Sequence, residues 1–370
     1  MPDSQLDRIH LTRRSALRAL LADAALDALL ITDLHNIRYL TGFTGSNAAL
    51  LVHAEGEERT LFCTDRRYAI QAKTQVPDLT HLLERASAPA LVARAAEHPT
   101  AHRTLGFESN HVTVDAFETL DRLASGIALR PTPGLTEQLR VVKDVTEIDA
   151  LRMACAAADR ALADLIEHGG VRAGWTERQV ARELENLMLD HGSEGASFTT
   201  IVAAGANSAI PHHRPSDAVL ADGDFVKLDF GAVIDGYHSD MTRTLVVGKP
   251  AAWQRDLYNL VMTAQSAGVT AARAGEKVGD VDEAARGVIE RAGYGDEFLH
   301  GLGHGVGLDV HEAPSLAKTG VGTLSAGMTV TVEPGVYLAG RGGVRIEDVV
   351  VVGEGDNDVL TLTTRDLVTV

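Results

Sequence analysis

Residues 227–244 read KLDFGAVIDGYHSDMTRT. Asp235 and Gly236 stand at its centre, flanked by alternating residues. An Asp-Gly pair in that setting is a strong signal for a two-residue β-hairpin turn. With those two residues as the loop, Ile234 pairs with Tyr237. The stretch therefore predicts an antiparallel hairpin with a defined register.

The predicted register brings two carboxylates together. Asp229 pairs with Thr242, and Asp240 lies two residues before that partner, on the same face and diagonal to Asp229. Cross-strand geometry puts the two carboxylates at roughly 5–7 Å from each other. Bare anions are costly among their apolar neighbours, so the pair favours a bound cation. From this hairpin alone, two solvated carboxylates on an exposed face are an equal alternative.

Later segments add histidines and further carboxylates. The glycine-rich stretch 300–312, HGLGHGVGLDVHE, holds three histidines: His300, His304 and His311. Glu333 ends the apolar strand of TVTVEPGVY, where Pro334 stops the hydrogen-bond ladder. Glu347 is expected inside a second strand, VRIEDVVVVG, with Arg345 on the same face. One carboxylate in an apolar strand usually faces solvent, but these features together favour a cluster of buried ligands.

The residue types favour a dinuclear metal site. Four carboxylates supply a charge of −4, which two divalent cations neutralise, and one imidazole completes the ligand set: Asp229, Asp240, Glu333, Glu347 and His304. Oxygen-rich ligation without a thiolate favours harder metals such as Mn²⁺, with Co²⁺ or Zn²⁺ as alternatives. Two such ions lower the pKa of a shared water molecule and generate hydroxide at neutral pH.

Length and composition narrow the class of protein. At roughly 150 residues per domain, 370 residues indicate two domains. The formal charge of −17 leaves no positive surface for nucleic acid. Cys63 and Cys155 are too few for a disulfide framework, and the N-terminus lacks the pattern of a secretory signal. No apolar run approaches the ~18 residues of a membrane helix, so we expect a cytoplasmic protein.

The periodicity of the sequence breaks at Pro131-Thr-Pro133-Gly134, which predicts domains at 1–133 and 134–370. In the first domain, helical patterns over 5–26 and 114–124 alternate with strand-like segments such as DALLIT and NAALLVHA. This alternation predicts an α/β domain.

The second domain interleaves helices with antiparallel hairpins, which favours an α+β architecture. A long helix is expected over 147–168, after a capping box formed by Thr146 and Asp149. A second capping box, formed by Thr176 and Gln179, is expected to begin the next helix.

Five motifs follow one another in a fixed order: ANSAIPHHRP (206–215), LDFGAVIDGYHSDMTRT (228–244), HGLGHGVGLDVHE (300–312), VEPGVY (332–337) and GGVRIEDVV (342–350). With them the chain resembles the creatinase/methionine-aminopeptidase ("pita-bread") metallopeptidases, and within these the Xaa-Pro peptidases, prolidase and aminopeptidase P. NIRYLTGFTGSNA and FCTDRRYAIQA resemble the non-catalytic domain of Xaa-Pro peptidases. The resemblance implies a C-terminal pita-bread catalytic domain, α+β, preceded by a smaller α/β creatinase-type domain.

The resemblance also implies a role for each metal ligand. Asp229 chelates one ion and orients the amino terminus of the substrate. Asp240 and Glu347 bridge both ions, while His304 and Glu333 bind the other. Glu333 in addition takes the proton from the attacking water as general base.

Five further residues receive roles around the substrate. His212 and His311 are implied to hydrogen-bond the substrate and to stabilise the tetrahedral intermediate, which makes them catalytic residues together with the general base. His300 is implied to line the pocket for the proline ring. Tyr337 and Arg345 resemble residues that orient the metal ligands through hydrogen bonds.

One departure from the family pattern concerns the C-terminal side of the substrate. In many prolidases the segment after the third histidine reads HE-x-P-R, and that arginine holds the carboxylate of the dipeptide. Here the segment is HEAPS, and Ser315 carries no charge. This favours aminopeptidase P, which accepts longer peptides, although Arg66, Arg67 or Arg214 is an alternative partner for a dipeptide carboxylate. Proline-containing dipeptides and oligopeptides are both candidate substrates.

The resemblance further implies a homodimer formed through the N-terminal domain. Two other functions are alternatives: a creatinase-type hydrolase of a small C–N substrate, and a peptide-binding member without catalysis. Creatinases do not keep the five ligands, and non-catalytic members usually lose some of them. The complete ligand set therefore favours a dinuclear-metal Xaa-Pro exopeptidase.

Overall fold

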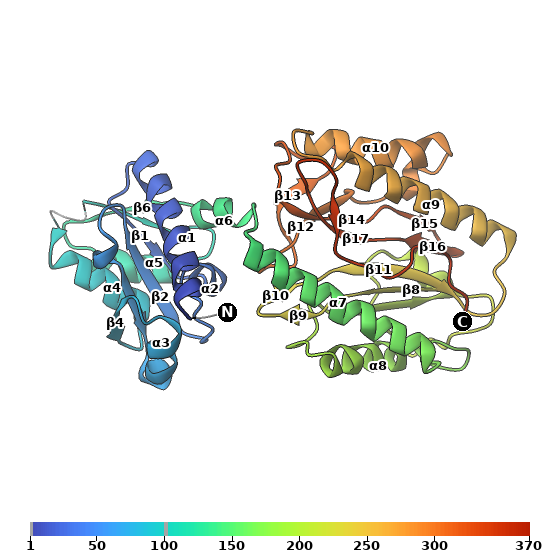
Figure 1. The fold of residues 1–370 in the computed structure, drawn as a ribbon, viewed down its shortest axis with the longest axis horizontal. Helices are drawn as coiled ribbons and strands as arrows, with labels where there is room; N and C mark the ends of the chain where they lie inside the picture. Colours follow the sequence, from blue (N-terminus) through green and yellow to red (C-terminus); the bar gives the residue numbers. More distant parts are fainter. Residues whose placement is uncertain (1–2, 100–102) are drawn as a thin grey trace. The chain divides into compact units, whose positions relative to one another are not determined.

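The computed structural model describes residues 3–99 and 103–370, and the chain forms unit 1, Met1–Arg140, and unit 2, Val141–Val370 (Figure 1). Helix α6 (Leu135–Arg140) is the last element of unit 1. The boundary predicted between 133 and 134 falls in the turn just before this helix. Each unit has its own hydrophobic core.

One mixed six-stranded sheet forms the centre of unit 1: β1 (Ala28–Ile31), β2 (Ala48–His53), β3 (Leu61–Thr64), β4 (Thr80–Leu83), β5 (Thr104–Phe107) and β6 (Ala128–Pro131). Its strand order is β4-β3-β2-β1-β5-β6. β1 runs antiparallel to β2 and parallel to β5. Every residue of β1 and β2 is buried, which explains why both read as continuous apolar runs.

Helices cover this sheet: α1 (Asp3–Asp23), α2 (Leu34–Thr41), α3 (Ala69–Gln75), α4 (Ser87–Ala96) and α5 (Val114–Leu123), with the 3-10 turns η1 (Glu57–Arg59) and η2 (Arg66–Tyr68). The predicted helices over 5–26 and 114–124 correspond to α1 and α5. Sequence reasoning missed α2 and α4. α2 has only eight residues, held between an Asp33 cap and a left-handed Gly42, too few for a helical period to stand out.

Unit 2 contains four long helices: α7 (Val145–Glu167), α8 (Glu177–Asp190), α9 (Ala252–Ala271) and α10 (Val278–Arg291). The capping box predicted for α7 was wrong by two residues. Asp144 is the cap, since its carboxylate accepts from the backbone N–H groups of Thr146 and Glu147 while Glu147 reaches back to the Asp144 N–H. The capping box of Thr176 and Gln179 before α8 is confirmed.

The strands of unit 2 form two main sheets and two short ribbons. The sheet β11-β8-β7 contains β7 (Ile201–Ala204), β8 (Phe225–Phe230) and β11 (Met241–Val246). The sheet β13-β12-β14-β17-β18 contains β12 (Gly303–Gly305), β13 (Glu312–Leu316), β14 (Thr329–Val332), β17 (Asp348–Val351) and β18 (Asp358–Val359). The remaining short elements are the ribbons β9 (Val233–Ile234) with β10 (Tyr237–His238) and β15 (Gly335–Leu338) with β16 (Gly342–Arg345), and the turns η4 (Gly205–Ala209) and η5 (Gly295–Glu297).

Two hydrophobic cores hold unit 2 together. One joins α7 and α8 to the sheet β11-β8-β7, through residues such as Leu162, Leu184 and Leu228. The other joins α9 and α10 to the five-stranded sheet, through residues such as Val281 and Val330. Figure 1 shows the two helix pairs on opposite outer sides of unit 2, with the strands between them. The helices thus cover the outer faces of the sheets and leave the side between the sheets for the site.

Candidate metal centre and substrate cavity

The hairpin of β8 and β11 has the register that its sequence predicts. Ile234 pairs with Tyr237, and Asp229 pairs with Thr242. Asp235 and Gly236 form the turn, with φ of +49° and +68°, so both adopt the left-handed conformation of a type I′ turn. The local turn chemistry thereby places both aspartates of the hairpin on one face.

Three carboxylates meet on that face. One oxygen each from Asp229, Asp240 and Glu347 lies within 4.8 Å of the others, and all three side chains are buried. Glu347 was expected inside a strand, but it stands in the break between β16 and β17. There its backbone N–H donates to the Thr242 carbonyl, and its carboxylate accepts from the Thr242 hydroxyl at 2.7 Å. These two bonds to the hairpin replace the regular ladder and turn Glu347 toward the aspartates.

His304 and Glu333 form a second group with Glu347, again with ligand atoms within 4.8 Å. Glu333 directly follows β14, as predicted. His304 Nε2 lies 3.3 Å from Glu333 and 3.6 Å from Asp240. Its Nδ1 lies 3.0 Å from the Gly305 carbonyl, which can only accept, so Nδ1 carries a proton and Nε2 is the nitrogen that faces the carboxylates. This arrangement presents a histidine nitrogen ready to bind a metal.

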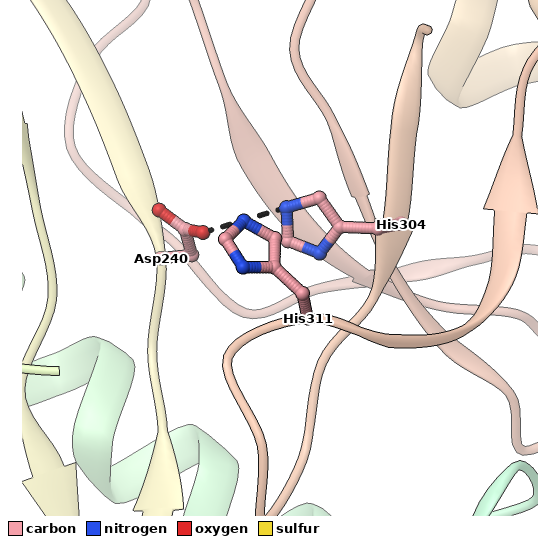
Figure 2. A group of neighbouring side chains, drawn as sticks. All are labelled: Asp240, His304 and His311. Atoms are coloured by element: carbon pink, nitrogen blue, oxygen red, sulfur yellow. Dashed lines mark ion pairs between the residues drawn. The ribbon is translucent and has the colours of Figure 1, made fainter. Parts of the chain in front are cut away.

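His311 lies against the same group. Figure 2 shows His304 and His311 beside the carboxylate of Asp240, and one ligand atom from each of the three residues lies within 4.8 Å of the others. The two imidazole rings are 4.3 Å apart between centroids, at 63°. The family resemblance implied a role for His311 only toward the substrate. The geometry places it where it reaches both the metal ligands and a molecule in the cavity.

The electrostatics of the group fit a pair of divalent cations. Burial raises the pKa of Asp240 well above its usual range, and the charges of Glu347 and Asp229 raise it further. Burial does the same to the pKa of Glu347. Asp229 Oδ1 is buried and has no hydrogen-bond donor among the residues that the structure describes. Crowded buried carboxylates with an unused oxygen need positive charge, and a donor set of oxygens and one imidazole suits such ions.

Glu333 and His304 are electrostatically linked. Burial alone raises the pKa of Glu333, but the hydrogen bond and charge of His304 lower it overall. Burial alone lowers the pKa of His304, but the hydrogen bond and charge of Glu333 raise it above the usual value. Glu333 is therefore held as a carboxylate, the form that a metal ligand or a general base requires.

A chain of hydrogen bonds runs behind the ligands. Arg345 forms an ion pair with Asp229 and donates to the Tyr337 hydroxyl at 2.8 Å. That hydroxyl lies 2.8 Å from His300 Nε2, and His300 Nδ1 lies 2.8 Å from the Gly301 carbonyl. Burial lowers the pKa of His300, so the neutral ring donates from Nδ1 and accepts the Tyr337 proton at Nε2. The chain connects a metal ligand to a residue of the substrate cavity.

A cavity of about 520 Å³ opens over this group. Every sequence-predicted site residue except Tyr337 lines it: His212, Asp229, Asp240, His300, His304, His311, Glu333, Arg345 and Glu347. Tyr337 is 4% exposed and lies behind the wall, where it contacts His300 and Arg345. Ser315 also lines the cavity, so the position that carries an arginine in many prolidases faces the substrate here as well.

Other residues near the cavity received no functional role from the sequence. Phe198, Thr199 and His213 line the cavity; His213, interpreted from the sequence as a neighbour of His212 and not a participant, is fixed to the buried Glu177 at 2.8 Å. Lys227 is fully buried two residues before Asp229. The strand alternation could have revealed Lys227, because residues two apart share a face of a strand. The His213 contact spans 36 positions and leaves no signal in the sequence.

Comparisons with known proteins identify the family of this chain. Residues 149–354 match the model of metallopeptidase family M24, and residues 13–142 match the creatinase/prolidase N-terminal domain. The chain therefore belongs to the M24 metallopeptidase family, a family of hydrolases, with the two-domain creatinase/prolidase architecture. The predicted family, the α+β fold class with its smaller N-terminal domain, and the assignment as a metal-dependent hydrolase are confirmed.

Individual relatives cover nearly the whole chain. An uncharacterized peptidase of Bacillus subtilis, YqhT, is 38% identical over 95% of this chain and 98% of its own length. The solved structure of an Xaa-Pro dipeptidase from Bacillus anthracis has a TM-score of 0.93 at 37% identity, covering 98% of this chain and 100% of that one. An X-Pro aminopeptidase from Thermotoga maritima has a TM-score of 0.87 at 33% identity, covering 96% and 99%. Among the described residues, no helix is long and apolar enough to span a membrane.

Proposed function

We propose that this chain is a two-metal Xaa-Pro exopeptidase that prefers dipeptides as substrates. The observation that carries the proposal is the group of four carboxylates and one histidine, three of them buried and two half-buried, that lines a cavity of about 520 Å³. Relatives named as Xaa-Pro dipeptidase and as X-Pro aminopeptidase, both aligned over nearly the full chain, support the substrate class.

The proposed metal ligands are Asp229, Asp240, His304, Glu333 and Glu347. Asp229, Asp240 and Glu347 would hold one ion, and His304 and Glu333, together with Asp240 and Glu347, would hold the other. A pair of divalent cations supplies, when bound, an acidified water and positive charge for the scissile carbonyl oxygen. The oxygen-rich ligand set favours Mn²⁺ over Co²⁺ or Zn²⁺.

The protein residues then provide proton transfer and substrate orientation. Glu333, held as a carboxylate, takes the proton of the attacking water. His311 and the exposed His212 donate hydrogen bonds to the tetrahedral intermediate. His300, whose ring packs edge-on to Phe298, forms an apolar wall for the proline ring. A bond before proline lacks an N–H, and this site requires no such donor from its substrate.

Arg214 is the proposed partner of the dipeptide's C-terminal carboxylate. It lines the cavity and is exposed, and in the described part of the chain it has no hydrogen bond or ion pair. The other cavity arginine, Arg345, is already bound to Asp229 and Tyr337. Arg66 and Arg67 lie in unit 1, where Arg67 is paired with Asp65. Arg214 can therefore replace the charge that Ser315 lacks.

The test is a paired assay on protein stripped with EDTA and reloaded with Mn²⁺, using Ala-Pro and Ala-Pro-Ala at equal concentrations. We expect faster hydrolysis of Ala-Pro, and Arg214→Ala should raise KM for Ala-Pro by about 10–100-fold, the usual loss for a charge-assisted hydrogen bond. Arg178→Ala, which removes an exposed arginine paired with Asp217, is the matched control and should change neither rate. Faster hydrolysis of Ala-Pro-Ala would indicate aminopeptidase P, and cleavage of neither would contradict the exopeptidase.

Three further properties belong to the proposal. The first is a homodimer, which stays a prediction from the resemblance. The second is a cytoplasmic location, which stays a prediction from the sequence. The third is the identity of the metal, for which Mn²⁺ is the first candidate to load.

A further inference from the structure

Lys227 is a buried lysine two residues before the proposed ligand Asp229, and it has no role in the reaction as described so far. It lies on β8 with an exposed fraction of 0%. Its ammonium donates to three backbone carbonyls, those of Ile210 at 2.7 Å and of Ser208 and Pro211 at 3.2 Å each. All three carbonyls belong to one short segment, 208–211. Lys227 therefore binds a backbone segment and not a side chain.

The same segment is also held by β16. Arg345 donates to the Pro211 carbonyl at 3.3 Å, and the Ser208 hydroxyl accepts from the Gly343 N–H at 2.9 Å. The Tyr337 ring lies 5.0 Å from the Lys227 nitrogen, close enough for a cation–π contact. Segment 208–211 is thus hydrogen-bonded to β8, which carries Asp229, and to β16, which ends two residues before Glu347.

The ionisation of Lys227 is subject to opposing effects. Burial and the charge of Arg345 lower the pKa of Lys227 to about 6, whereas Asp229 raises it. Three carbonyl acceptors favour the protonated form, because an ammonium has three N–H donors and a neutral amine has two. Either form donates to the segment, so the contact persists in both.

The three residues that follow the segment all line the cavity: His212, His213 and Arg214. Their backbone lies outside any helix or strand, since η4 ends at Ala209 and the next strand begins at Phe225. Beyond the end of η4, backbone carbonyls such as those of Ile210 and Pro211 depend on side-chain donors to hold them in place. Lys227 supplies the largest share of those bonds to 208–211.

We propose that Lys227 is a positioning residue that fixes segment 208–211 and thereby aims His212 into the substrate cavity. This inference rests on the proposed function, in which His212 binds the substrate. Lys227 itself does not reach the substrate, since it is absent from the described residues that line the cavity. Its effect on hydrolysis is therefore expected to pass through His212.

The first test measures hydrogen exchange and requires no activity. In Lys227→Met, backbone amides within 206–214 should exchange about tenfold faster than in the unsubstituted protein, the effect of losing a net 1.4 kcal/mol of hydrogen bonding. Tyr258→Phe is the matched control, because it removes another buried donor to backbone carbonyls, those of Arg365 and Asp366, away from the cavity. Unchanged exchange in 206–214, or the same increase in the control, would overturn the proposal.

The second test is a double-mutant cycle on hydrolysis of Ala-Pro with Mn²⁺. Lys227→Met should lower kcat/KM by about tenfold in the presence of His212. In a His212→Ala background the same change should have little further effect, because the group that it positions is gone. If the two substitutions lower kcat/KM independently, so that their factors multiply in the double variant, the proposal is overturned. Such a result would indicate a general loss of structure, which acts whether or not His212 is present.

The two tests separate failure of this inference from failure of the proposed function. If the unsubstituted protein cleaves neither Ala-Pro nor Ala-Pro-Ala, the proposed function fails and the exchange experiment still decides whether Lys227 holds the segment. If Lys227→Met does not fold, Lys227→Gln is the second variant, because it keeps N–H donors on a shorter side chain. It should raise exchange in 206–214 in the same direction by a smaller factor, and unchanged exchange would contradict the role.

Discussion

Asp240 shows how a single residue can be unfavourable for the fold and necessary for the site. Its side chain is 4% exposed, among apolar neighbours, and faces three other carboxylates. A lone buried carboxylate costs several kcal/mol unless it is paired. Asp240 forms an ion pair with His304 at 3.6 Å, but one imidazole cannot balance four crowded carboxylates, and divalent ions would supply the rest of the positive charge.

Asp240→Asn tests this at the residue scale. It keeps the size of the side chain but removes an anion of the proposed ligand set, so hydrolysis of Ala-Pro should fall by more than about 100-fold and should not recover with excess Mn²⁺; loss of an outer partner alone costs about 10–100-fold. The metal-free variant should unfold at a temperature no lower than the parent protein, because one repulsive charge is gone. Asp217→Asn, at the surface, is the control. Retained activity of Asp240→Asn with Mn²⁺ would contradict the ligand assignment.

The raised pKa values of Asp240 and Glu347 predict a pH dependence of stability. Both groups hold their protons in the folded state at pH values where the unfolded chain, with pKa near 3.8 and 4.5, has lost them. The folded state then binds more protons, so the stability of the metal-free protein falls as pH rises above those values. Metal binding requires the deprotonated ligands and strengthens over the same range.

Thermal unfolding with EDTA and with Mn²⁺, measured from about pH 5 to 8, checks this dependence. The difference in Tm between the two conditions should widen as pH rises. A constant difference would mean that the two carboxylates do not bind the metal.

At the scale of elements, the hairpin of β8 and β11 is the part that the sequence determined most completely. Its register depends on a two-residue turn and on alternation, and both are local. The site built on it was harder to predict in detail. Glu347 leaves its strand because of bonds to Thr242, 105 positions away. In the sequence, Lys227 looks like an ordinary strand lysine. Only the structure shows that its side chain binds the backbone of segment 208–211.

Adding a side chain should have different consequences at two glycines of this hairpin. Gly236 has φ of +68°, so Gly236→Ala should cost about 1 kcal/mol of stability through backbone strain. Gly231 has no room: a Cβ there would lie 1.8 Å from the Ser239 carbonyl oxygen, on the opposite strand next to Asp240. Gly231→Ala should therefore destabilise the protein far more and weaken Mn²⁺ binding. Urea unfolding and metal titration of both variants check this, and equal effects would contradict it.

At the scale of the whole molecule, the sequence predicted two domains of different class, and the family models confirm that architecture. Composition, motif order and helix periodicity were sufficient for this because each covers long stretches of chain. Contacts between distant segments, such as His213 with Glu177, were not accessible from one sequence.

The homodimer implied by the resemblance is also a prediction at this scale. The chain's mass is 39.3 kDa, so sedimentation at micromolar concentration should give a single species of about twice that value. A species with the mass of one chain would contradict the dimer. It would leave the assignment of the metal ligands unaffected, because all five belong to unit 2 of one chain.

The five ligands are proposed to bind two divalent ions that the reaction requires. The most direct measurement is a titration of EDTA-stripped protein with Mn²⁺, following bound metal and Ala-Pro hydrolysis in the same samples. We expect activity to rise with metal occupancy and to level off at two ions per chain. Full activity with no bound metal, or two bound ions without hydrolysis of Ala-Pro or Ala-Pro-Ala, would contradict the account.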